Sequence, residues 1–143
     1  MALDRLAVGL AEREQWADLL KVLAQKVELT TDPAELVALF HQIADLYLDH
    51  VRSDSQAVLV LERLLELDPD DLAVVRRLRE LYRRRHDAER TFAALNRELE
   101  LTPQDAAPDE RVAILEALAD TAQNEFLQPE RAVDFHRQIL ELE

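Results

Sequence analysis

The sequence has no cysteine, and its 143 residues include a single glycine, Gly9. The absence of cysteine excludes disulfide bonds, thiolate metal sites and cysteine nucleophiles. Nucleotide-binding loops and nucleophile elbows need clustered glycines, so those motifs are excluded as well. No uninterrupted apolar run is longer than Ala57–Leu61. A membrane-spanning helix needs roughly 20 apolar residues, so we expect no membrane insertion.

Basic residues are also scarce, with 17 lysines and arginines against 30 aspartates and glutamates, a formal net charge of −13. Such a surface repels phosphates, and we expect no nucleic acid partner. Lysine occurs only at Lys21 and Lys26, while arginine, alanine and leucine are abundant, which is typical of GC-rich bacterial genomes. Together with the lack of cysteine, this composition leads us to expect a bacterial protein of the cytoplasm.

The chain repeats itself. The segment Arg13–Thr30 aligns with Arg85–Thr102 at a shift of 72 residues, and Ala44-Asp45 recurs as Ala119-Asp120 at a shift of 75. Extra residues in the loop around Gln104 account for the difference. A fixed period of this kind predicts an array of stacked structural units.

Apolar residues recur at spacings of three and four along the chain, and no stretch shows sustained strand alternation. Aspartate followed by proline marks helix starts at Asp32-Pro33 and Asp68-Pro69. The expected helices cover residues 1–11, 14–29, 33–47, 54–67, 69–86 and 88–101, with two more that begin at 108 and 129. Their short connections predict antiparallel neighbours.

The segment Ala57–Pro69 (AVLVLERLLELDP) resembles the second helix of a tetratricopeptide repeat (TPR), and Thr91–Pro103 is similar to the same element. The resemblance implies one all-α domain, a right-handed α-solenoid of four helical hairpins at about residues 1–31, 32–68, 69–102 and 103–143. Two residues depart from the family pattern: Arg79 and Thr91 stand where small residues are usual. The sequence starts and stops within the repeat pattern, so we expect a fragment of a longer repeat protein that could self-associate through its exposed ends.

Nothing in the sequence indicates catalysis. The four histidines stand far apart, and the best metal-like pair, His41 with Asp45, supplies only two ligands. Paired carboxylates such as Glu116 with Asp120 carry little specificity in so acidic a chain. We therefore expect no catalytic residue, no metal site, no cofactor and no enzyme activity.

One region is basic. Between Leu72 and Arg97 there are eight arginines against three acidic residues, a local charge of +5. The resemblance implies that the first helix of each hairpin lines a concave groove. We call the basic residues that would face this groove the arginine strip; it consists of Arg76, Arg77, Arg83 and Arg84, with Glu80 among them. The predicted groove also includes His41, Gln42, Asp45, Asp49, Glu116, Asp120, Gln123 and Asn124.

Arginine suits bidentate bonding to carboxylates, so an acidic segment of a partner protein is one occupant of the strip. In the other interpretation, carboxylates of adjacent helices (Asp45, Asp49, Glu116 and Asp120) neutralise the arginines within the molecule. Trp16 has a similar pair of interpretations, as a wedge between hairpins or as a partner contact.

The sequence thus predicts a non-catalytic scaffold or adaptor that binds another protein or peptide. Three other roles stay open. The chain could be a structural spacer or oligomerisation segment of a longer array, or a regulatory subunit of a larger complex. A compact four-helix bundle would have no groove at all.

Overall fold

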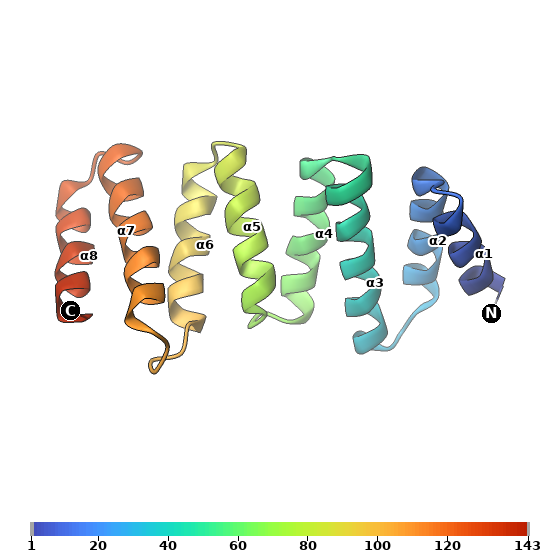
Figure 1. Ribbon diagram of the computed structural model, residues 1–143, viewed down its shortest axis with the longest axis horizontal. Helices are drawn as coiled ribbons and strands as arrows, with labels where there is room; N and C mark the ends of the chain where they lie inside the picture. The colour runs from blue at the N-terminus through green and yellow to red at the C-terminus, as the bar shows by residue number, and fades with distance from the viewer. Residues whose placement is uncertain (1, 143) are drawn as a thin grey trace. The chain divides into compact units, whose positions relative to one another are not determined.

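The computed structural model describes residues 2–142, which form eight α-helices and no β-strand (Figure 1). The helices are α1 (Ala2–Glu12), α2 (Trp16–Leu29), α3 (Pro33–Leu46), α4 (Asp54–Leu67), α5 (Leu72–Arg84), α6 (Ala88–Leu101), α7 (Pro108–Asn124) and α8 (Pro129–Leu142). One π-helical turn, η1 (Tyr47–Val51), continues α3. The all-α prediction is confirmed; the predicted helix start at Met1 lies outside the described residues.

Side-chain caps set several helix starts. Asp32 accepts a hydrogen bond from the Ala34 amide at 3.2 Å, with Pro33 in the first turn as predicted. The predicted start of the fifth helix at Pro69 is wrong by three residues. Asp71 is the cap instead, because its carboxylate reaches the amide of Val74 at 3.3 Å. Pro69 lies in the turn that precedes it.

The turn inside each hairpin contains one residue in the left-handed conformation, and none of these residues is glycine. Glu14, Arg52, His86 and Leu127 have φ of 56°, 58°, 58° and 52°. The next residue donates its amide back to the preceding helix, as Asp87 does to the carbonyl of Tyr82 at 3.0 Å. The second helix therefore starts at Trp16, not at the predicted Glu14, which stands in the turn.

The chain divides into two compact units, which we call unit 1 (to Pro69) and unit 2 (from Asp70). Each unit contains two of the predicted hairpins. In unit 1 the core includes Leu23, Ala44 and Leu61, none more than 3% exposed. The handedness of the predicted solenoid and its grouping as a single domain stay predictions.

One core cluster of unit 2 lies between α6, α7 and α8. Leu118 is fully buried, and Phe92 makes edge contacts with Phe126 and Phe135 at centroid distances of 5.4 and 6.0 Å. Burying a leucine or phenylalanine side chain stabilises a fold by about 1.5–3 kcal/mol. These three aromatic side chains thus pack against one another in this core. Among residues 2–142, no helix is long and apolar enough to cross a bilayer.

Candidate protein-interaction grooves

Each unit repeats one arrangement of three helices. In unit 1, α1 and α3 both pack on α2 but, within residues 2–142, not on each other. In unit 2, α5 and α7 both pack on α6 in the same way. The first helices of two hairpins thus form walls, and the second helix between them forms a floor.

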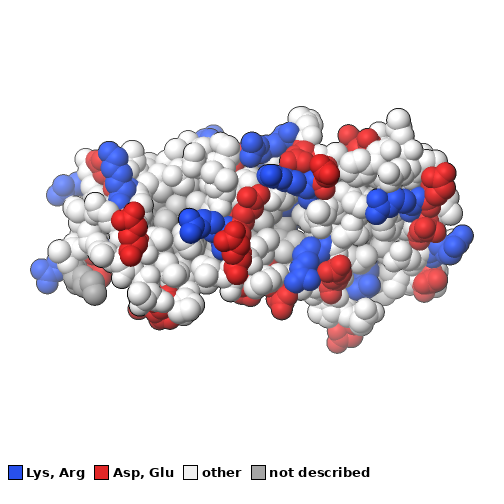
Figure 2. All heavy atoms as spheres, turned by 180° about the vertical axis from the view of Figure 1, so that it is seen from behind, with Lys and Arg blue, Asp and Glu red and all other residues white. Residues whose placement is uncertain are grey.

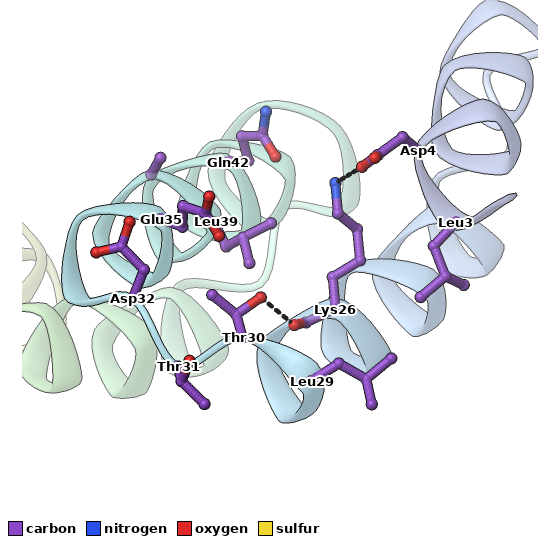
Figure 3. Close-up of a pocket in the computed structure, with 11 residues that line it drawn as sticks. Leu3, Asp4, Lys26, Leu29, Thr30, Thr31, Asp32, Glu35, Leu39 and Gln42 are labelled. Carbon is purple, nitrogen blue, oxygen red and sulfur yellow. Dashed lines mark hydrogen bonds and ion pairs between the residues drawn. The ribbon is translucent and has the colours of Figure 1, made fainter. Parts of the chain in front are cut away.

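The groove of unit 1 contains two adjoining pockets of about 450 and 410 Å³ that share Asp4, Lys26 and Gln42. Figure 3 shows the first of them. Its further lining residues are Leu3, Leu29, Thr30, Thr31, Asp32, Glu35, Ala38 and Leu39. The second pocket adds Ala7, Val8, Ala11, Trp16, Leu19, Leu23, Asp45, Leu46, Asp49 and His50. We call the two pockets together the unit 1 groove.

An ion pair connects two helices of this groove. Lys26 of α2 points toward α1, and its Nζ lies 2.5 Å from Oδ1 of Asp4 (Figure 3). The hydrogen bond and charge of Lys26 lower the pKa of Asp4 below its ordinary value. The backbone carbonyl of Lys26 also accepts a hydrogen bond from the Thr30 hydroxyl at 2.5 Å. Lys26, the one lysine or arginine among the lining residues of the unit 1 groove, thus has a carboxylate partner.

At the other end of the groove, the rings of Trp16 and His50 stack, with centroids 3.9 Å apart and an interplanar angle of 17°. His50 belongs to η1, which ends at Arg52 in the left-handed conformation, and the Ser53 amide donates to the Tyr47 carbonyl at 2.8 Å. π-helical turns are rare and occur often at functional sites. Trp16 is half-buried between the first hairpin and His50 of the next, and it lines the groove. Its role as a partner contact stays a prediction.

One stripe of α3 and η1 forms a wall along both pockets. Glu35, Ala38, Gln42, Asp45 and Asp49 follow one another at spacings of three and four, which places them on one helix face. Three of the predicted groove residues are therefore brought together here. The fourth predicted residue of this unit, His41, lines neither pocket.

The corresponding groove of unit 2 holds a pocket of about 310 Å³. Arg79 and Arg83 of α5 and Asp120 of α7 line it, above a floor that includes Thr91 and Leu95. The remaining lining residues are His86, Asp87, Ala88, Ala117, Thr121 and Glu125. Of the residues predicted for this unit, Arg83 and Asp120 line the pocket. Glu116, Gln123 and Asn124 are exposed on α7, and the Asn124 amide donates to Asp120 at 2.5 Å.

Glu98 is the residue that the sequence interpretation missed. Its side chain is only 6% exposed, and its two oxygens face two arginines of α5. Oε1 accepts a hydrogen bond from Nε of Arg76 at 3.2 Å. Oε2 lies 2.9 Å from Nε of Arg79, outside hydrogen-bond geometry, so that contact is an ion pair only. Arg79, which replaces the small residue usual in the repeat, is thus accommodated by a buried carboxylate.

The other residues of the arginine strip lie further along α5. Glu80 binds Arg83, with Arg83 Nη2 at 2.7 Å from its Oε1. This hydrogen bond lowers the pKa of Glu80 and raises the pKa of Arg83. Arg77 is half-buried and Arg84 is exposed. Glu98 and Glu80 thus pair with arginines of α5. The neutralising roles of Asp45, Asp49, Glu116 and Asp120 stay predictions.

The shift of 72 residues relates the two grooves to each other. It maps Asp4 onto Arg76 and Lys26 onto Glu98, so each ion pair has its counterpart in the other unit with the charges exchanged. The same shift maps Ala7 onto Arg79 and Ala11 onto Arg83. The equivalent walls thus carry short apolar side chains in unit 1 and long cationic ones in unit 2.

The chain matches no protein-family model and no curated protein sequence. Its structure is similar to that of MamA (residues 41 to the end) from Desulfovibrio magneticus RS-1, with a TM-score of 0.57 at 16% identity over 98% of this chain and 73% of that one. It is also similar to that of a putative kinesin light chain from Podosopora anserina with nearly identical TPR-like repeats. The TM-score is 0.59 at 18% identity, and the match covers 99% of this chain and 73% of that one. The fold is TPR-like. The resemblance read from the sequence is thereby confirmed for the fold.

The described residues contain no group of three or more histidine, aspartate or glutamate side chains that could hold a metal ion. On the face shown in Figure 2, blue and red side chains lie in mixed groups. Local charge must therefore be assessed groove by groove.

Proposed function

We propose that the chain is a non-catalytic, cytoplasmic protein–protein interaction module, a scaffold or adaptor, whose arginine strip binds an acidic segment of a partner protein. TPR-like neighbours support the general role, since repeats of this kind present preformed surfaces to other proteins. The fold alone does not define a function, so the specific role depends on the groove residues.

The charge balance around α5 carries this proposal. The helix has five arginines and one acidic residue, Glu80, so its formal charge is +4. This positive charge occurs in a chain whose total charge is −13. Acidic partners are therefore attracted to this helix more than to the rest of the surface.

Two carboxylates also fix the positions of the guanidinium groups. Glu98 forms ion pairs with Arg76 and Arg79, and Glu80 forms one with Arg83. Side chains that are ordered before binding lose less conformational entropy when a partner docks. A guanidinium can then offer its remaining N–H groups to an incoming carboxylate in a bidentate arrangement.

The test is quantitative affinity capture from the source cell with the wild-type chain and with Arg77→Glu combined with Arg84→Glu as baits. These two positions are chosen because neither pairs with the buried Glu98, so the variant keeps that contact. We expect loss of the strongest-retained proteins, and those proteins should have acidic segments. The matched control is Arg5→Glu combined with Arg137→Glu, which makes the same charge change on exposed residues of α1 and α8. Equal retention by all three baits would show that the strip is not the binding surface.

A role as an oligomerisation segment is the second candidate, and one observation favours it. Val133 and Leu140 of α8 are 53% and 68% exposed, and their spacing of seven places them on one face of the helix. Two copies could bury this face against each other. Sedimentation velocity over a range of concentrations tests it, with Val133→Lys and Leu140→Lys as the variant that should remain monomeric.

A further inference from the structure

We infer that the unit 1 groove is a second docking site, with a preference opposite to that of the arginine strip: it accepts a segment of a partner protein that carries lysine or arginine next to apolar residues. The inference shares with the proposed function only the premise that the chain binds proteins. It concerns different residues, in the other unit.

The charge of the groove is the first argument. Asp4, Asp32, Glu35, Asp45 and Asp49 line its two pockets, and Lys26 is the only lysine or arginine among the lining residues. Since Lys26 binds Asp4 at 2.5 Å, the groove keeps an excess of four negative charges with His50 neutral. An occupant with basic side chains is therefore favoured, and an acidic one is repelled.

The apolar surface of the groove is the second argument. Ala7 and Ala11 on the α1 wall are short, and Leu19 and Leu23 form a buried floor. Val8 and Leu29, at 58% and 74% exposed, present apolar side chains to solvent at its edges. Apolar side chains of an occupant would cover this surface and remove it from water.

The comparison with unit 2 is the third argument. Arg79 and Arg83 occupy the positions of Ala7 and Ala11 there, and that pocket is smaller, at about 310 Å³ against 410 Å³. The unit 1 groove thus lacks the two cations that would repel a basic segment. Counted over the lining residues with histidine neutral, the unit 2 pocket has a formal charge of −1, from two arginines against Asp87, Asp120 and Glu125, and the unit 1 groove has −4. The unit 1 groove is therefore the more favourable of the two for a basic segment.

The length of the acidic wall sets the size of the occupant. From Glu35 to Asp49 the stripe of α3 and η1 extends over about 21 Å at 1.5 Å per residue. A helical segment of about 14 residues or an extended one of about six matches this length. Asp45 and Asp49 mark the end beside the Trp16–His50 stack.

Trp16 supplies the measurement, because it is the single tryptophan of the chain and lines the groove. The probe is an acetylated and amidated peptide of about 14 residues that contains leucine, alanine and lysine but no aromatic residue. Its twin has glutamate in place of lysine. We expect the lysine peptide to change Trp16 fluorescence saturably and the glutamate peptide to leave it unchanged.

Two variants locate the binding. Asp45→Asn with Asp49→Asn should weaken the binding of the lysine peptide by about threefold per charge removed, roughly tenfold in all. Ala7→Arg with Ala11→Arg, which installs the unit 2 residues, should weaken it by more than about tenfold through like-charge repulsion. The matched control, Asp18→Asn with Glu28→Gln, removes the same charge from exposed positions of α2 outside the groove and should bind as the wild type does.

Circular dichroism and calorimetric titration accompany each measurement, so an unfolded variant or binding elsewhere is recognised. Equal affinity for the two peptides, or unchanged affinity of the Asp45→Asn, Asp49→Asn variant, would overturn the inference. Binding heat without any Trp16 response would also overturn it, because the peptide would then bind elsewhere. A Trp16 response that depends on protein concentration alone would overturn it too, because the occupant would then be a second copy of the chain. The variant with Arg77→Glu and Arg84→Glu should still bind the lysine peptide, which separates this result from the fate of the proposed function.

Discussion

Glu98 of α6 accepts a hydrogen bond from Arg76 of α5 at 3.2 Å, and this pair is the charge-exchanged counterpart of Lys26 and Asp4 in the preceding unit. Both pairs connect the first helix of a hairpin to the second at the same repeat position. The two units differ in burial: the carboxylate of Glu98 is 6% exposed, whereas that of Asp4 is 53% exposed. An ion pair thus connects the two helices in both units, but the helices that carry the acidic and the basic residue are exchanged. Its desolvation costs more free energy in unit 2, where the carboxylate is buried.

The buried carboxylate leads to the first prediction. Replacing Arg76 and Arg79 together by glutamine leaves Glu98 without a cation, and we expect this variant to lose about 3–5 kcal/mol of unfolding free energy. Glu98→Gln should cost less, about 1–3 kcal/mol, because the two arginines it releases are 44% and 31% exposed and can be hydrated. Urea denaturation followed by circular dichroism gives both values.

The control for this pair of variants is Glu100→Gln on the same helix. Glu100 pairs with Arg97 at 3.1 Å, but its side chain is 65% exposed, and we expect a change within about 0.5 kcal/mol. If the double arginine variant were no less stable than Glu98→Gln, the buried carboxylate would not depend on its cations.

The second prediction concerns the ionisation of Asp4. Its pKa is lowered by the hydrogen bond and charge of Lys26, so its carboxyl carbon should titrate in NMR below the ordinary range. In Lys26→Met the titration midpoint of Asp4 should rise toward the ordinary value of an aspartate. In Lys21→Met, which removes an exposed lysine of the same helix that lines neither pocket, it should stay low.

The direction of the pH effect on stability follows from this shift. A carboxyl group whose pKa is lower in the folded state than in the unfolded state stabilises the fold above the unfolded-state pKa. That contribution is lost as the pH falls through the folded-state pKa. The wild type should therefore lose more stability than Lys26→Met when the pH falls through that window, in parallel acid titrations.

The helices were predictable from sequence because apolar spacing reports burial along each of them. The start of α5 was not, since Asp68-Pro69 and Asp71 are both cap signals and the choice depends on which carboxylate reaches an amide. Within the candidate site, the wall formed by Gln42, Asp45 and Asp49 followed from repeat position. The role of Glu98 did not, because a glutamate within a charged stretch gives no sign that it is buried.

The third prediction tests the packing of unit 2. Leu118 is fully buried among Phe92, Leu95 and Ile114, and Leu118→Ala should cost about 2–5 kcal/mol through lost burial and the cavity left behind. Leu140→Ala, at a position that is 68% exposed, makes the same chemical change on α8 and should cost far less. Similar losses in thermal denaturation for the two variants would mean that Leu118 is not part of a close-packed core.

The fourth prediction concerns the scarcity of glycine. Leu127 turns the chain between α7 and α8 with φ of 52° and its side chain 78% exposed, so it bears the strain of the left-handed region without compensating burial. Glycine adopts this conformation freely, and Leu127→Gly should raise the unfolding free energy by about 0.5–1 kcal/mol, after the entropy that glycine adds to the unfolded chain is subtracted.

Gly9 is the opposite case: it lies inside α1, and a Cβ there would meet no atom within 4 Å. Gly9→Ala should therefore stabilise the chain by about 0.5–1 kcal/mol. Differential scanning calorimetry of both single variants and the double variant checks this; additive gains are expected because the sites are independent. A lower melting temperature for Leu127→Gly would show that the leucine side chain contributes more to the turn than its backbone strain removes.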